Sequence, residues 1–283
     1  MRAWAVGSLV VNMLIIVTGA IVRLTSSGLG CPTWPQCSGS SYVPRPELGI
    51  HGVIEFANRM LTFVLVALAI GMVLAAFRVT ATASGESMRP IRTLSVVVGL
   101  GIPLQAIIGG ISVLTQLNPW VVALHMLVSV VIIGLCVGMV HRTDDTVALT
   151  AAPLVRRLVL AIVGVTGLVI VLGTVVTGAG PHSGDLAVQR NGISPELAAH
   201  VHSWAVWLLL VITVVTLVIT KSRLVAALLA VQLAQGIIGY IQYFTGLPTV
   251  GVALHMAGLA VLTAATVHVF WRLRDVAVTA NAG

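Results

Sequence analysis

Eight long apolar runs limit the folds that this sequence can adopt. Each run holds roughly the 20 mostly apolar residues that an α-helix needs to cross the hydrocarbon core of a bilayer. Hydrophobic residues make up 58% of the chain and charged residues only 8%, which is far from the composition of a soluble domain. We therefore expect an all-α polytopic membrane protein with eight transmembrane helices, at about residues 4–22, 51–77, 93–114, 121–140, 158–177, 200–220, 224–244 and 250–271.

Positive charges are distributed unevenly between the two sets of connecting loops. Arg23, Arg45 and Arg190 fall in one set, whereas most other Lys and Arg residues fall in the other set or at the termini. Because Lys and Arg accumulate in cytoplasmic loops, we expect a cell-membrane protein with both termini in the cytoplasm. This topology signal, helped by contact with anionic membrane lipid, accounts for the net charge of +7 and requires no nucleic acid partner.

Residues 105–126 resemble residues 235–256 at a constant offset of 130. Twelve of these twenty-two positions are identical without a gap, and the run VALHM is shared. The sequence GAIV at 19–22 resembles GTVV at 173–176 more loosely. An internal repeat of this kind indicates that the protein consists of two similar halves.

Each half would contain four helices. Because four is an even number, both halves enter the membrane from the same side, unlike the halves of an inverted repeat. We therefore predict two tandem four-helix bundles, residues 1–145 and 146–283, related by a pseudo-twofold axis along the membrane normal.

Five histidines lie near the outer ends of the even-numbered runs, namely His51, His125, His200, His202 and His255. An imidazole in an apolar helix is costly unless it has a partner. A single histidine could simply donate a hydrogen bond between helices. Its repetition at matching depth instead predicts paired imidazoles that hold a flat iron porphyrin inside a four-helix bundle. The two halves would then give two heme sites near the outer face.

His125 and His255 occupy equivalent positions of the repeat, whereas the choice between His200 and His202 is less direct. His202 lies 19 residues before Lys221, and Asn58 lies 20 residues before Arg78. We favour His202 as the ligand because it is the better equivalent of Asn58. His200 remains the alternative, since residues two apart point to different helix faces.

Several long motifs resemble the heme A synthase family, in particular its actinobacterial type: TGAIVRLTSSGLGCPTWPQC, IEFANR, GTVVTGAGPHSGD and the two VALHM runs. The resemblance spans nearly the whole chain. It implies an enzyme that oxidises the methyl group at porphyrin carbon 8 of heme O to a formyl group, which yields heme A for cytochrome c oxidase. It also implies a heme O substrate in the N-terminal half, ligated by His125. A heme b cofactor would lie in the C-terminal half, ligated by His202 and His255.

The segment from Glu55 to Arg59 departs from the family pattern of Glu, two residues, His, Arg. Asn58 stands where the family has a ligand histidine, and asparagine is a poor iron ligand. Either the substrate iron has one protein ligand, or another group replaces the missing one. His51 shares a helix face with Glu55 and Asn58, but it lies about 10 Å from Asn58 along the helix axis. It is therefore a candidate substitute ligand, and equally an outer gate or proton relay.

Glu55 matches the catalytic acid of the family. A carboxylate at this depth must be neutral, paired or hydrated, and Arg59 at i+4 has the favourable orientation for a helix ion pair. The two charges could merely neutralise each other. We hypothesise instead that Glu55 faces the porphyrin methyl group, where it stabilises developing positive charge or relays protons. Arg59 and Arg23 would meet the heme propionates.

Two of the three cysteines, Cys31 and Cys37, bracket PTWPQ in the first outer loop, whereas Cys136 lies within an apolar run. Disulfides persist on the oxidising side of a membrane, and the spacing is compatible with closure. The resemblance supports a disulfide between Cys31 and Cys37. We interpret it as a staple of the loop over the substrate site, in preference to a redox pair.

Two other functions use the same histidines: a di-heme electron carrier and a heme transporter or chaperone. Neither needs Glu55 beside the porphyrin edge. The resemblance implies heme O synthase as a partner and cytochrome c oxidase as the downstream recipient. Glycine-rich stretches lack the strand-to-helix context of a nucleotide site, so electrons come from a donor that the sequence does not identify.

Overall fold

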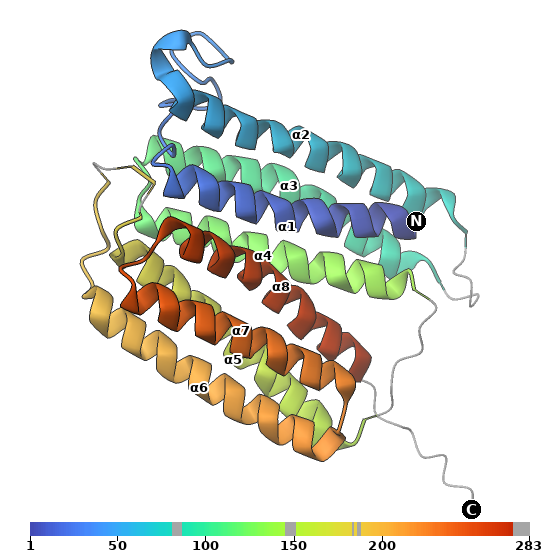
Figure 1. Ribbon diagram of the computed structural model, residues 1–283. Coiled ribbons are helices and arrows are strands. Elements are labelled where there is room, and N and C mark those ends of the chain that lie inside the picture. Colours follow the sequence, from blue (N-terminus) through green and yellow to red (C-terminus); the bar gives the residue numbers. More distant parts are fainter. Residues whose placement is uncertain (81–86, 145–150, 183, 186–187, 274–283) are drawn as a thin grey trace, which may run out of the picture.

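The computed structural model describes residues 1–80, 87–144, 151–182, 184–185 and 188–273. Within them the chain forms eight long helices and one short 3₁₀ helix, η1 (Pro46–Leu48) (Figure 1). All eight are long and apolar enough to cross a membrane, which confirms the prediction of an all-α multi-pass membrane protein. The helices are α1 (Arg2–Leu24), α2 (Gly49–Arg78), α3 (Arg89–Leu114), α4 (Pro119–Arg142), α5 (Pro153–Ala179), α6 (Pro195–Thr220), α7 (Arg223–Phe244) and α8 (Thr249–Leu273).

Several helices begin a few residues before the apolar run that predicted them. The N-cap side chain of Asn118 accepts a hydrogen bond from the backbone of Trp120, and that of Ser194 accepts one from Leu197. Pro119 and Pro195 follow at the first helical position, where proline suits the helix because its missing N–H would be unpaired anyway. Apolar runs mark the hydrocarbon core, whereas capping residues mark the true helix start.

The two sets of four helices have the same order of neighbours. In the first half α1, α2, α3 and α4 pack in a ring, with α1 against α4, and α5 to α8 repeat this ring in the second half (Figure 1). The halves meet through α4 against α8, α1 against α8 and α4 against α5. Exchanging the halves leaves this set of contacts unchanged, as expected for the predicted repeat. The predicted boundary at residue 145 lies outside the described residues.

Each half has its own apolar core, and a third cluster joins them. Ile16, Ile133 and Ala260, from α1, α4 and α8, form the buried cluster at the junction. Large apolar side chains such as Phe63 and Val218 remain exposed on the outer faces of the helices. This distribution suits a lipid environment, where apolar side chains can face outward at no cost.

The loop between α1 and α2, predicted to lie on the outer side, is folded tightly over the start of α2. The disulfide between Cys31 and Cys37 is present, which confirms its prediction. A Cβ added at Gly30 would overlap the backbone carbonyl of His51, and one added at Gly110 of α3 would overlap the Trp34 ring. Glycine therefore allows the loop backbone to touch the helix, and the loop covers the outer end of the first bundle.

Replacing Gly30 with alanine tests this close contact. The overlap involves backbone atoms, which cannot rotate away, so we expect Gly30→Ala to lower stability by about 1–3 kcal/mol. Gly164 of α5 has open space at its Cβ position, so Gly164→Ala is the matched control and should leave stability unchanged or slightly raised. Thermal unfolding of the two variants in detergent measures the difference. Equal unfolding temperatures would contradict the packing described.

Candidate functional site

Three imidazoles have ring nitrogens that are buried without a hydrogen-bond partner. They belong to His125 on α4, His202 on α6 and His255 on α8, and in each the unpartnered atom is Nδ1. Buried polar groups are almost always paired. Three unpaired ring nitrogens on even-numbered helices therefore indicate that these side chains are arranged for a ligand.

Each of the three rings lies against a glycine of the preceding helix. The Cβ position of the glycine lies 3.1 to 3.6 Å from the ring Cε1 atom, in the pairs Gly109 with His125, Gly173 with His202 and Gly239 with His255. A larger side chain there would press on the ring. The glycines of α3, α5 and α7 thus leave room for an imidazole between helices.

The two histidines of the C-terminal half lie close enough to interact electrostatically. The backbone carbonyl of Val169 on α5 acts electrostatically on the His202 ring, and that of Gln235 on α7 acts on the His255 ring. Two neighbouring imidazoles from α6 and α8, each with a buried unpartnered Nδ1 atom, fit the axial ligation of a heme iron.

His125 has surroundings equivalent to those of His255. The side chain of Gln105 donates to the His125 carbonyl at 3.2 Å, and Gln235 donates to the His255 carbonyl at 3.3 Å. The offset of 130 therefore holds in the hydrogen bonds as well as in the sequence. The sequence comparison contained both glutamines but gave no sign that they support the backbone of the histidines.

Asn58 on α2 is the residue that the sequence comparison aligns with His202 of the second half. Its Oδ1 accepts a hydrogen bond of 2.7 Å from Thr18 of α1, so the amide is engaged within the protein. The neighbouring Gly19, which is equivalent to Gly173, has nothing within 4 Å of its Cβ position. The space that an imidazole fills in the second half is therefore open in the first.

The two remaining candidate histidines lie away from the bundle interiors. His51 is exposed, and its Nδ1 lies 2.9 Å from the hydroxyl of Ser27 in the outer loop. His200 is also exposed, with Nδ1 2.7 Å from the carbonyl of Glu196. The geometry favours His202 over His200 as a ligand and places His51 at the rim, where the gate or relay role stays a prediction.

Glu55 forms a buried ion pair with Arg59, as the i, i+4 spacing predicted. The carboxylate is 4% exposed, and its Oε1 accepts from Arg59 Nη2 at 2.6 Å and from Nε at 3.1 Å. Its Oε2 accepts from the backbone N–H of Cys31 at 2.6 Å. The carboxylate therefore connects α2 to the disulfide loop.

Backbone carbonyls of the same loop accept most of the remaining hydrogen bonds of the Arg59 guanidinium. The guanidinium donates to the carbonyls of Cys31, Thr33 and Gln36 at 3.0, 3.1 and 3.3 Å. The sequence predicted the ion pair but not this clamp, because backbone acceptors in a loop leave no signal in residue types. In this arrangement Arg59 holds the loop, and its contact with a propionate stays a prediction.

Arg23, counted among the loop residues in the sequence, lies in the last turn of α1. Its Nη2 atom donates to the carbonyl of Thr177 on α5 at 2.7 Å. Its side chain therefore crosses from the first half to the second. A propionate contact for Arg23 also stays a prediction.

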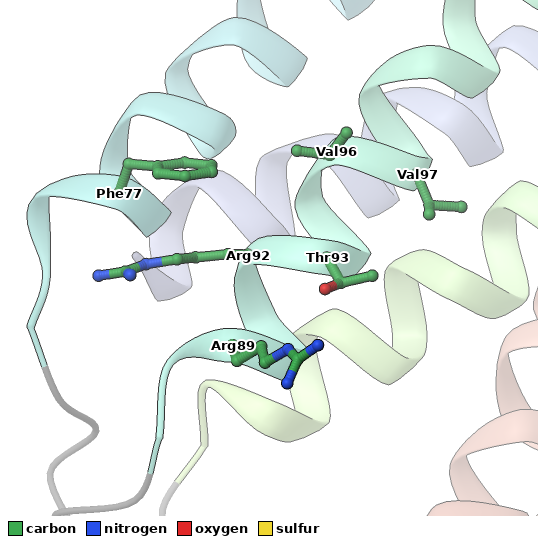
Figure 2. A pocket seen from close by; sticks show the side chains of 6 residues that line it. All are labelled: Phe77, Arg89, Arg92, Thr93, Val96 and Val97. Atoms are coloured by element: carbon green, nitrogen blue, oxygen red, sulfur yellow. The ribbon is translucent and has the colours of Figure 1, made fainter.

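Two cavities lie outside the histidine positions. One of about 350 Å³ is at the end of the helices where α2 ends and α3 begins; Phe77, Arg89 and Arg92 line it, and Arg92 extends beneath the Phe77 ring (Figure 2). The other, of about 200 Å³, is at the opposite end among the loops, beside Leu29, Asn118 and Gln189. Neither is the site of the paired histidines.

The fold and the site define a polytopic helical membrane protein with buried imidazoles on the even-numbered helices α4, α6 and α8. The chain belongs to the COX15-CtaA family, described as cytochrome oxidase assembly proteins, whose profile matches residues 2–267.

Curated relatives carry the name heme A synthase. The protein of Bacillus pumilus is 29% identical over 132 residues, which are 46% of this chain and 41% of the relative. That of Listeria welshimeri is 26% identical over 183 residues, 62% of this chain and 58% of the relative. That of Lysinibacillus sphaericus is 30% identical over 132 residues, which are 46% of this chain and 41% of the relative. The chain spans about half the length of the curated relatives it matches.

Removing the charge of Arg59 tests the clamp. Arg59→Gln leaves Glu55 buried without its cation, and breaking a buried pair costs about 3–5 kcal/mol. The pair of Arg2 and Asp144 is the control, because its side chains are 60% and 23% exposed and an exposed pair contributes less than about 1 kcal/mol. We expect Arg59→Gln, but not Arg2→Gln, to lower the unfolding temperature and to open the disulfide loop to protease. Equal effects would show that the clamp does not stabilise the loop.

Proposed function

We propose that this protein is a heme A synthase, which oxidises the methyl group at carbon 8 of heme O to a formyl group. Family membership and the names of its curated relatives support the proposal. The observation that carries it is an asymmetry between the halves. If Asn58 is aligned with His202, Glu55 and Arg59 correspond to Ala199 and Ser203. An acid beside a candidate porphyrin site thus occurs in the first half and is replaced in the second.

In this proposal the C-terminal half, residues 146–283, holds heme b between His202 and His255. A bound heme b would supply one-electron chemistry at its iron. The protein contributes two buried rings, on which the backbone carbonyls of Val169 and Gln235 act electrostatically. Gly173 and Gly239 supply the space in which those rings lie.

The N-terminal half, residues 1–145, holds the substrate heme O through His125. Asn58 is tied to Thr18 and leaves the opposite side of the site to water or to the substrate. Glu55 shares the helix face of Asn58 and lies about one turn further out. It would therefore line the outer edge of the bound porphyrin.

Glu55 is the group that can hold or move a proton in this site. Oxidation of a methyl group to a formyl group releases protons, and the buried carboxylate can accept one at Oε1 or Oε2. Arg59 and the Cys31 N–H hold the carboxylate in one position. The disulfide loop excludes water from this end of the bundle, which strengthens the electrostatic effect of the carboxylate on the substrate.

The orientation and partners follow from the same proposal. Both termini would lie in the cytoplasm, with the heme sites near the outer face of the cell membrane. Heme O synthase would deliver the substrate through the lipid phase, and cytochrome c oxidase would receive the product. The site contains no nucleotide-binding motif, so a separate donor or acceptor exchanges electrons with heme b.

Replacing Glu55 with glutamine tests the reaction. Glu55→Gln keeps the size of the side chain but removes its basicity, so we expect heme A formation to fall about 10²-fold or more, as for loss of an acid–base group. The heme b spectrum should be unchanged. Pigments extracted from membranes that also make heme O give the measurement. Heme O that the wild type leaves unaltered would instead indicate an electron carrier or a heme transporter.

Restoring the histidine of the family pattern tests the substrate site. Because the space beside Gly19 is open, Asn58→His should place a second imidazole opposite His125 and give heme O in this half a low-spin, two-histidine spectrum. Asn58→Gln is the control, since an amide remains a poor iron ligand. Electron paramagnetic resonance of protein loaded with heme O measures the change. An unchanged spectrum in a folded Asn58→His protein would show that position 58 does not face the iron.

A further inference from the structure

A cluster of basic side chains lies where the outer ends of the two halves meet. Arg23 comes from the last turn of α1, whereas His182 and Arg190 come from the loop between α5 and α6. The charge of Arg190 acts on Arg23, and the charges of both arginines act on His182. We call these three residues the outer basic cluster.

Each arginine of the cluster retains a buried donor without a partner. Arg23 Nη2 donates to Thr177 and Arg190 Nη2 to the Pro181 carbonyl, both at 2.7 Å. The Nε of Arg23 and the Nη1 of Arg190 are buried and unpartnered. Unmade hydrogen bonds of buried charged groups are costly, and two neighbouring cations repel each other. An anion between the two guanidinium groups would remove both costs.

The lowered pKa of His182 reflects its burial and the positive charges beside it. Burial lowers the pKa of His182 below its usual value, and the charges of Arg23 and Arg190 lower it further. The ring is therefore neutral at neutral pH and can donate one hydrogen bond without adding a third positive charge. Arg59 gives the contrast, because Glu55 and three backbone carbonyls already satisfy its guanidinium.

The cluster lies slightly outside the level of both candidate porphyrin sites. On α1, Thr18 contacts Asn58, and Arg23 lies five residues further out, which is about 7.5 Å along the axis. On α5, Gly173 faces a ligand ring, and Thr177 lies four residues further out, about 6 Å. A side chain or acid group that extends from the edge of a porphyrin can span such a distance.

None of the three cluster residues lines the cavity of about 200 Å³. It lies among the outer loops of both halves, and Gln189, which directly precedes Arg190, is part of its wall. The two loops are joined there by a hydrogen bond from the Gly28 N–H to the Gly184 carbonyl, at 2.9 Å. The loops of the two halves are therefore joined beside Arg23, whose side chain lies 3.7 Å from the Cβ position of Gly184.

We propose that the outer basic cluster is an oxyanion site that binds a propionate carboxylate of the porphyrin held in the N-terminal half. The inference rests on the proposed function. Arg23 approaches the carboxylate from the same half as the porphyrin, and Arg190 and His182 approach it from the other half. The substrate site is then incomplete without the loop between α5 and α6, so the second half takes part in substrate binding.

The test compares heme O with its dimethyl ester, in which both carboxylates are neutral. Full-length protein with its heme b in place should bind heme O about 10-fold or more tightly than the ester, as expected for loss of a charged hydrogen bond. Arg190→Gln and Arg23→Gln should bring this ratio close to one while binding of the ester stays unchanged. Arg45→Gln is the matched control, because Arg45 is an exposed arginine of the other outer loop, and it should keep the wild-type ratio.

The outcomes separate this inference from the proposed function. A wild-type ratio of one overturns the inference without any variant, as does a ratio that Arg190→Gln leaves unchanged. Phosphorus bound to the purified protein measures the other source of an oxyanion, a lipid phosphate. If Arg190→Gln loses that phosphorus but keeps the wild-type ratio of heme O to ester affinity, the site binds a lipid phosphate. That result overturns the proposal of a propionate site. Failure of the wild type to bind heme O at all contradicts the proposed function instead.

Discussion

Every polar group between these helices must find a partner inside the protein, because lipid offers none. Backbone groups meet this demand by forming helices, but the Nδ1 atoms of His125, His202 and His255 do not. Their free nitrogens are the constraint on which the interpretation of the site depends. Under the proposed function, coordination of a heme iron offsets the cost of burying these rings, and glycines of the preceding helices keep the space that the rings occupy.

The tandem arrangement explains how one bundle can serve two tasks. Equivalent glutamines support the carbonyls of His125 and His255, so the framework of both halves is alike. The differences are concentrated on α2 and α6, where Asn58 and Glu55 of the first half are aligned with His202 and Ala199 of the second. A bundle with two imidazoles favours a firmly held cofactor, whereas a bundle with one imidazole and an acid favours a substrate that must enter, react and leave.

The sequence predicted the parts of this protein that depend on residue type and spacing. Apolar runs gave eight helices, and the four-residue spacing gave the pair of Glu55 and Arg59. Backbone acceptors were not predictable, since the carbonyls of Cys31 and Thr33 that hold Arg59 could belong to any residue. The starts of several helices were not predicted, because hydropathy marks apolar residues only. A helix start depends instead on a local capping residue such as Ser194.

Contacts between the halves were the least predictable, because they join residues far apart in the chain. Arg23 and Arg190 are both outer arginines in the sequence, and nothing in their spacing indicates that their charges act on one another. Their proximity has a mechanistic consequence if both contact one carboxylate. Binding of the substrate would then reinforce the junction between the halves that Arg23 and Thr177 already form. Electron exchange between two sites depends on their separation, so an anion shared between the halves would align substrate binding with the geometry that the reaction requires.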